Sequence, residues 1–168
     1  MDSLAAPLIR KMLIGQMLPS DPNRTPVYDN TRQIWTVQTA QDRPSQLCWN
    51  LVWLQGTVVD HSQPDCFVLD DATGRVLVDY KAGENHDSLK KLRVGDYVIV
   101  IGRLMKMPTE SAAPQSWQVS AKTVTLITDQ FTSARSVDSQ SDTTDVLGAA
   151  AAAELSWPLE VMDMSLVY

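Results

Sequence analysis

Residues 47–59, LCWNLVWLQGTVV, form the longest β-rich run of the chain and contain a glycine, Gly56, in their interior. A glycine inside a strand usually marks a β-bulge or a sharp bend. Four further β-type runs follow, namely CFVL at 66–69, RVLVDY at 75–80, YVIVIGRL at 97–104 and WQVSAKTVTLI at 117–127. The sequence therefore predicts one long bent strand followed by four more.

The connections between these runs favour one barrel topology. Asp70-Asp71-Ala72-Thr73-Gly74 has the composition of a tight turn between the second and third strands. Residues 83–92 predict a loop or a single helical turn before the fourth strand. This order is typical of a mainly β, five-stranded Greek-key barrel of the oligonucleotide/oligosaccharide-binding (OB) type. An SH3-like barrel is the main rival, but its strand lengths and connections fit less well.

We expect the barrel to occupy residues 47–128, preceded by an extension over 1–46. Within that extension, residues 3–18 predict a short helix with one wide apolar face, and 34–38 predict an additional weak strand. The helix either caps the barrel core or binds a partner.

The segments after the barrel differ sharply from it in composition. Residues 129–153 are rich in Ser, Thr, Asp and Ala and predict a flexible linker, and 154–168 predict an amphipathic helix. The apolar stripe of this helix consists of Leu155, Leu159, Met162 and Leu166, widened by Trp157 and Val161. Such a stripe must be buried, either on this chain or on a partner.

Acidic side chains outnumber basic ones by 20 to 14, which gives a net charge of −6. That balance argues against a stand-alone nucleic-acid binder with a basic face and against binding to anionic membranes. Residues 129–168 carry seven acidic side chains and one basic one, whereas the barrel segment is nearly neutral. The acidity is therefore a property of the linker and terminal helix.

Motifs that carry catalysis or bind cofactors are absent, so we expect neither an enzyme nor a cofactor. Two cysteines and two histidines at unsuitable spacing predict no metal site, and His61 and His86 are expected to be solvated. No apolar run reaches the roughly 20 residues of a membrane span, and no secretory signal is expected. An intracellular, reducing compartment follows as the default.

A barrel that binds single strands would need aromatic platforms and a cationic groove. Six aromatic side chains lie in the barrel segment, and we expect most of them in the core: Trp49, Trp53, Phe67, Tyr80, Tyr97 and Trp117. Lys90, Lys91 and Arg93 form a small local basic patch. A stand-alone single-stranded DNA-binding protein remains the alternative hypothesis.

Three motifs occur together in one order along the chain. They are LVWLQGTVV at 51–59, LDDATG at 69–74 and VGDYVIVIG at 94–102, followed by Lys122 and by WPLEVMD at 157–163. This combination resembles the RecQ-mediated genome instability protein 2 family, above all because the W-x-L-E-V ending accompanies the W-x-Q-G strand. Pro158, Met162 and the longer linker depart from the family pattern.

The resemblance implies a non-catalytic nuclear subunit. Its expected partners are the C-terminal barrel of RecQ-mediated genome instability protein 1, topoisomerase III alpha, a Bloom-type RecQ helicase and a peptide of the Fanconi anaemia M translocase. Together these proteins would form a complex that dissolves double Holliday junctions. The subunit would contact DNA mainly through this complex.

The resemblance also suggests roles for individual residues. The expected partner-binding residues are Lys122, Leu155, Trp157, Leu159, Val161, Met162 and Leu166. The expected structural residues of the barrel are Trp53, Gly56, Gly74, Tyr97 and Gly102.

Overall fold

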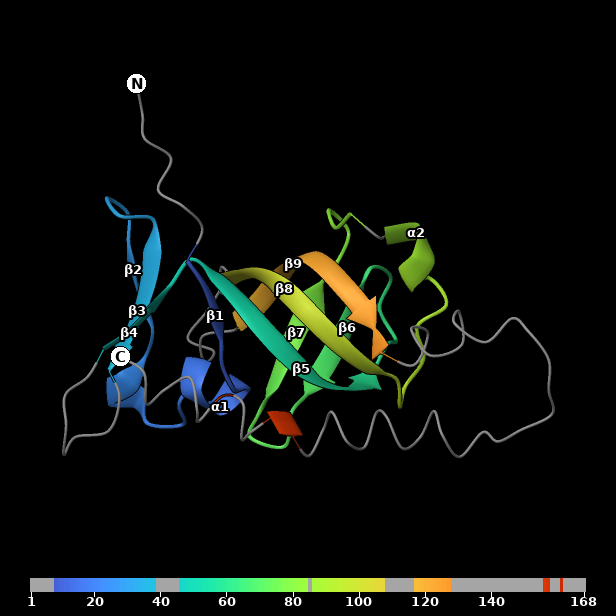
Figure 1. Ribbon diagram of the computed structural model, residues 1–168, viewed down its shortest axis with the longest axis horizontal. Coiled ribbons are helices and arrows are strands. Elements are labelled where there is room, and N and C mark those ends of the chain that lie inside the picture. The colour runs from blue at the N-terminus through green and yellow to red at the C-terminus, as the bar shows by residue number, and fades with distance from the viewer. Residues whose placement is uncertain are drawn as a thin grey trace, which may run out of the picture.

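The computed structural model describes residues 8–38, 46–84, 86–107, 117–127, 156–157 and 161. In chain order the elements are β1 (Ile9–Lys11), α1 (Ile14–Met17), a 3-10 turn (Pro22–Arg24), β2 (Val27–Asp29), β3 (Ile34–Gln38), β4 (Gln46–Trp49), β5 (Leu51–Asp60), β6 (Cys66–Asp70), β7 (Arg75–Asp79), α2 (His86–Leu89), β8 (Tyr97–Lys106) and β9 (Trp117–Leu126). Figure 1 shows a barrel with a smaller sheet beside it. In this part of the chain, no helix is long and apolar enough to cross a bilayer.

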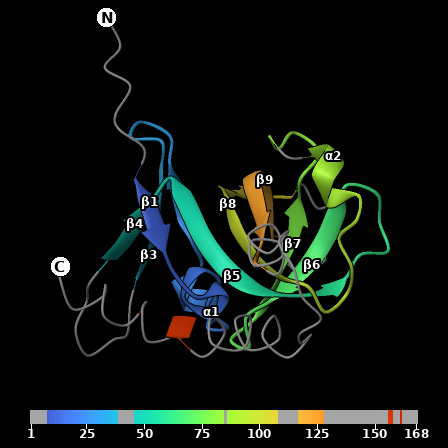
Figure 2. The ribbon, with the colours of Figure 1, turned by 45° about the vertical axis from the view of Figure 1, so that its right-hand side comes forward.

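Five strands close into a barrel because β5 has two partners. Residues 52–57 of β5 pair with β8, and residues 57–60 pair with β6. The circuit is completed by β6 with β7, by a parallel pairing of β7 with β9, and by β9 with β8. Figure 2 shows these strands curving around a common centre, with α1 and α2 at opposite ends. The predicted mainly β OB-type barrel is therefore confirmed.

The long β-rich run differs from the prediction in two details. It is divided at Asn50 into β4 and β5, which belong to different sheets. The irregularity of β5 lies between Val58 and Asp60 and not at Gly56. Gly56 is required for another reason, because a Cβ at this position would overlap the backbone carbonyl oxygen of Asp70.

The predicted helix over 3–18 is wrong for most of the described part of its range. Residues 9–11 form β1, which pairs in parallel with Leu51–Trp53, and only Ile14–Met17 form a helical turn. The apolar spacing is compatible with both conformations, and pairing with the open edge of β5 decides between them. Met12, Ile14 and Met17 are buried, so this segment closes one end of the core, as expected of a core cap.

The smaller sheet consists of β2, β3 and β4, so the weak strand predicted at 34–38 is confirmed. Trp35 on β3 attaches it to the barrel, since its Nε1 donates to the carbonyl of Leu104 at 3.0 Å. The Trp35 ring also makes an edge contact with Trp117 and a tilted contact with Tyr28. Of the six barrel aromatics, Trp53 and Trp117 are half-buried and the other four are buried.

His61 and His86 are not solvated as expected, because both are half-buried and hydrogen-bonded. The Nδ1–H of His61 donates to the carbonyl of Leu92 (3.0 Å), and Tyr80 Oη, whose pKa is raised by burial, donates to Nε2 (2.9 Å). His86 donates through Nε2 to the carboxylate of Asp65 at 2.8 Å. The two histidines therefore fasten the α2 segment to the end of the barrel.

Candidate interaction surface

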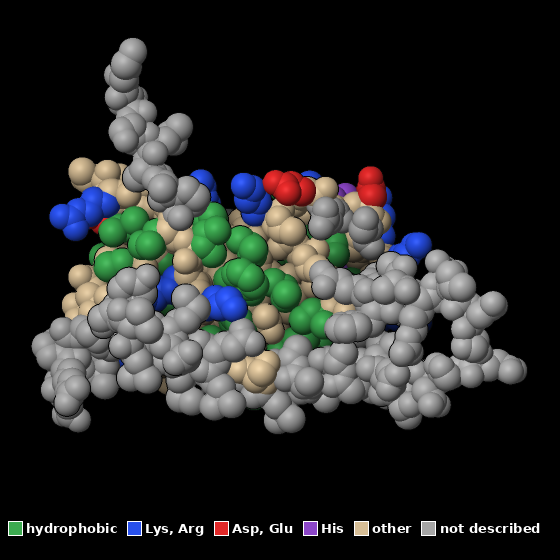
Figure 3. Space-filling model, in the orientation of Figure 1, with side chains coloured by type: hydrophobic (Ala, Val, Ile, Leu, Met, Phe, Trp, Pro, Cys, Tyr) green, Lys and Arg blue, Asp and Glu red, His purple; other side chains and the backbone are tan. Residues whose placement is uncertain are grey.

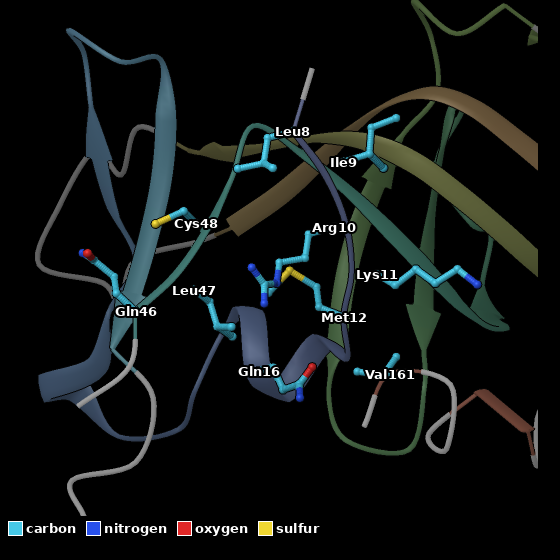
Figure 4. A pocket seen from close by; sticks show the side chains of 10 residues that line it. All are labelled: Leu8, Ile9, Arg10, Lys11, Met12, Gln16, Gln46, Leu47, Cys48 and Val161. Atoms are coloured by element: carbon cyan, nitrogen blue, oxygen red, sulfur yellow. The ribbon is translucent and has the colours of Figure 1, made fainter. Parts of the chain in front are cut away.

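Strand β1 forms an apolar ridge at the edge of the barrel sheet. Leu8 and Ile9 are 44% and 45% exposed, and in the described part of the chain β1 pairs only with β5. Figure 4 shows the side chains of Leu8, Arg10 and Met12 pointing toward β4, whereas Ile9 and Lys11 point to the other side. Strand alternation thus gives the ridge two flanks, and each flank borders a hollow.

The first hollow is the β1–β4 cavity, with a volume of about 310 Å³. Strands β1 and β4 meet where the amide groups of Asn50 and Leu51 donate to the carbonyl of Leu8 (3.1 and 3.2 Å), and they diverge from there. The lining residues are Leu8, Ile9, Arg10, Lys11, Met12, Gln16, Gln46, Leu47, Cys48 and Val161. The walls are mainly apolar, with two cations among the lining residues.

The second hollow is the Lys122 groove, with a volume of about 560 Å³. Its lining residues are Ile9, Leu51, Ala82, Glu84, Ile101, Arg103, Ser120, Ala121, Lys122 and Thr123. The Lys122 side chain is exposed, while its carbonyl accepts a hydrogen bond from the amide of Glu84 at 3.0 Å. Figure 3 shows hydrophobic side chains gathered across the face that bears β1 and β5. Ile9 lines both hollows, so the ridge joins them into one surface.

Lys11 connects this surface to the C-terminal segment. Its Nζ lies 4.6 Å from the ring centroid of Trp53 and 5.6 Å from that of Trp157, both within the range of a cation–π interaction. Trp157 and Val161 have helical backbone and are each only 2% exposed. Among the described residues, the buried indole Nε1 atoms of Trp53 and Trp157 have no hydrogen-bond partner. Apolar packing and the Lys11 cation therefore hold the two rings.

The expected site residues divide into three groups. Lys122 is exposed in its groove, whereas Trp157 and Val161 are buried on this chain. The remaining expected partner-binding residues, Leu155, Leu159, Met162 and Leu166, lie outside the described residues.

The expected structural residues are all in the barrel. Tyr97 is buried, and Trp53 is only half-buried. A Cβ on Gly102 would overlap the backbone of Ser120, and a Cβ on Gly74 would lie 3.0 Å from Cγ2 of Ile14. The glycines therefore allow close contacts between segments.

No sequence motif identifies Leu8, Ile9 and Lys11 as part of this surface. A helix over 3–18 gives no reason to expect Lys11 beside Trp53 or Trp157. The only local signal for a strand is short, because β1 has just three residues. Its parallel partner lies some forty residues further along the chain, so the pairing depends on tertiary structure.

Comparison with known families now extends these observations. A family model described as RecQ-mediated genome instability protein 2 matches residues 8–165. The chain belongs to this family. The range matched by the RecQ-mediated genome instability protein 2 family begins at the ridge and includes β1, both hollows and Val161. The resemblance noted from the sequence motifs is therefore confirmed.

Two solved structures are similar to parts of this chain. The hypothetical protein ygiW from E. coli is 24% identical, with 46% of this chain and 74% of that chain covered and a TM-score of 0.35. A replication protein A heterotrimer bound to single-stranded DNA is 16% identical, with 91% and 97% covered and a TM-score of 0.43. Both TM-scores are below 0.5, so neither structure guides the functional proposal. No curated protein matches the chain.

Proposed function

We propose that this chain is a non-catalytic scaffold subunit that pairs through its OB-fold and C-terminal helix with RecQ-mediated genome instability protein 1. The pair would stabilise a nuclear complex of topoisomerase III alpha and a Bloom-type RecQ helicase, which dissolves double Holliday junctions. A peptide of the Fanconi anaemia M translocase would dock on the pair. Membership of the family supports this assignment.

The apolar ridge carries the proposal. Leu8 and Ile9 are almost half exposed, and the lining of the neighbouring Lys122 groove includes the apolar residues Leu51 and Ile101. Contiguous exposed apolar surface bordered by charge is typical of protein interfaces. We infer that the partner barrel docks on the ridge and the groove, with Lys122 at the border of the interface.

Binding of the purified sister subunit tests the proposal. We expect Ile9→Asp to weaken binding at least about a hundredfold, because a carboxylate would be buried at the centre of the interface. Val94→Asp is the matched control, since Val94 is 62% exposed on a turn outside both hollows. Isothermal titration calorimetry of both variants gives the comparison. Equal affinity of the two variants would place the interface elsewhere.

A titration with labelled single-stranded DNA distinguishes the scaffold function from the alternative, a stand-alone single-stranded DNA-binding protein. A scaffold subunit should bind the oligonucleotide weakly on its own, whereas a stand-alone binder should bind tightly with a steep salt dependence. Tight binding by the isolated chain that is lost in Lys122→Glu would favour the alternative.

A further inference from the structure

The burial of Trp157 and Val161 bears on the geometry of the whole C-terminal helix. Successive residues of an α-helix are separated by about 100° around its axis. Trp157 and Val161, four residues apart, therefore share a face, and this face is buried on the chain itself. If the whole segment followed an ideal helical wheel, the sequence stripe of Leu155, Leu159, Met162 and Leu166 would be about 160° away from that face. The two sets of residues would then be on opposite sides.

We propose that the C-terminal helix has two opposed apolar faces, and that the inner one continues through residues 162–168 so that Met164 fills the β1–β4 cavity. The inner face consists of Trp157, Val161, Met164 and Tyr168. The outer face is the stripe of four residues, and its use by a partner rests on the proposed function. The docking of Met164 does not depend on it.

Three properties of the cavity favour this occupant. Val161 already lines the cavity, and Met164 is the next apolar residue on its face, three positions further on. An apolar cavity of about 150 Å³ can hold a benzene ring, so the volume of about 310 Å³ has room for a methionine side chain. Methionine is also the residue that adapts best to an irregular apolar space.

Charge favours the same arrangement. The lining of the cavity includes two cations, Arg10 and Lys11. The C-terminal segment from 154 to 168 carries Glu154, Glu160 and Asp163 and no basic residue. Opposite charges on the two surfaces favour docking within the chain, where the tether gives a high effective concentration.

Trp157 then acts mainly inside this chain. It packs against Lys11, which also contacts Trp53, and thereby fixes the start of the helix on the barrel. A helix held in this way has its outer face already oriented before a partner arrives. Such preorganisation reduces the conformational entropy that binding would otherwise cost.

The native methionines allow a direct test without mutation. Met162 and Met164 are two residues apart but lie on opposite faces, and oxidation by hydrogen peroxide depends on exposure. Met12, which is fully buried, and Met105, which is 47% exposed, provide internal standards. In the isolated full-length chain we expect Met164 to oxidise about tenfold more slowly than Met162. Tandem mass spectrometry of the proteolytic fragments resolves each site.

Other results would overturn the proposal. Oxidation of both Met162 and Met164 at the rate of Met105 would mean that the cavity is not filled by this segment. Protection of both, together with a dimeric mass by light scattering, would mean that a second copy covers the helix. Protection of Met164 that develops only after the sister subunit is added would assign the cavity to that partner.

Two variants check the role of the inner face. Trp157→Ala should raise the oxidation rate of Met164 to that of Met162, while Met12 stays protected and so reports an intact core. Leu159→Asp on the outer face is the matched control and should leave Met164 protected. If Met12 becomes oxidised in Trp157→Ala, the barrel has opened in that variant. Val161→Asp then replaces Trp157→Ala as the test of the inner face. A rate for Met164 that changes in neither inner-face variant contradicts the proposal. Because no partner is present, these results are independent of the proposed function.

Discussion

The carboxylate of Asp71 accepts a hydrogen bond from the backbone amide of Ile14 at 2.6 Å, across 57 residues of sequence. Thr73 on the same turn accepts from the amide of Gly15 at 2.9 Å. The first amides of a helix have no partner within the helix, so these two side chains cap α1. The turn between β6 and β7 thus fastens the N-terminal segment to the barrel.

We expect Asp71→Ala to lower the free energy of unfolding by about 1–2 kcal/mol, as for the loss of a strong helix cap. The other carboxylate oxygen accepts from Thr73 and Gly74, so the turn loses its own bonds as well. Urea unfolding followed by circular dichroism measures the change. Asp29→Ala is the control, because the interactions of Asp29 in the described structure are all local: it accepts from the amides of Thr31 and Arg32 and lies 3.8 Å from the exposed Arg32 guanidinium. Equal losses in both variants would mean that the contact with α1 contributes nothing.

Gly56 and Gly95 should respond differently to alanine. A Cβ on Gly56 would meet the backbone of Asp70, which cannot move without opening the β5–β6 pairing, so Gly56→Ala should cost about 2–3 kcal/mol. Gly95 has a φ of +97° and open space around it, so Gly95→Ala should cost only the backbone strain of about 1–2 kcal/mol. Thermal unfolding of the two variants gives the comparison. A smaller loss for Gly56→Ala than for Gly95→Ala would contradict this explanation.

The decrease in the free energy of unfolding at acidic pH should depend on Arg75. Its Nε donates to Asp70 at 2.6 Å, and this bond, helped by the amide of Ala72, lowers the pKa of Asp70 from its ordinary 3.8. A carboxyl group with a lowered folded pKa contributes stability above its ordinary pKa, and this contribution disappears as the pH falls through the folded value. Arg75→Gln should raise the pKa of Asp70 only part of the way, because the Ala72 bond remains.

A carbon-detected NMR titration of the aspartate side chains measures this pKa. Lys90→Gln is the control, since Lys90 lowers the pKa of Asp87 and is not a cause of the shift at Asp70. An unchanged Asp70 titration in Arg75→Gln would show that the bond is not formed in solution.

The indole of Trp35 should decide whether the smaller sheet stays attached to the barrel. Trp35→Phe keeps an aromatic ring but removes the buried hydrogen bond to the carbonyl of Leu104. The loss of one hydrogen bond costs about 0.5–1.5 kcal/mol. We expect faster hydrogen exchange in β2 and β3, with β6 and β7 unchanged. Uniform acceleration throughout the chain would mean that the two sheets unfold as one unit.

The barrel could be predicted because its information is local. Alternation in 117–127, the DDATG turn and the turn before Tyr97 each specify a strand or a reversal within a few residues. The ridge could not be predicted in this way, because β1 is a strand only through its parallel pairing with Leu51–Trp53. Lys11 likewise gains its importance from two tryptophans that are distant in sequence.

The apolar spacing of the C-terminal segment predicts a single stripe that Trp157 and Val161 widen. The burial of these two residues on this chain distinguishes them from Leu155, Leu159, Met162 and Leu166, which lie outside the described residues. In the two-faced helix proposed above, the family motif W-x-L-E-V would contribute Trp157 and Val161 to the inner face and Leu159 to the outer one.

This separation predicts different behaviour for two variants that would otherwise look equivalent. Trp157→Ala removes a side chain that is 2% exposed, so the free energy of unfolding of the isolated chain should fall by about 3–5 kcal/mol or the helix should detach. Leu159→Asp should leave the free energy of unfolding of the isolated chain unchanged, because the proposal assigns Leu159 to a face that only a partner buries.

Both variants should lose binding to the sister subunit, for different reasons. Leu159→Asp would remove a contact, which at the centre of an interface costs about 2–4 kcal/mol. Trp157→Ala only releases the helix, so Trp157→Phe, which keeps an aromatic ring beside Lys11, should recover much of the affinity. Calorimetric titration of the two Trp157 variants with the sister subunit measures the recovery. If Trp157→Phe restores the free energy of unfolding of the isolated chain and the affinity is still absent, the indole of Trp157 itself contacts the partner, and its role is not confined to this chain.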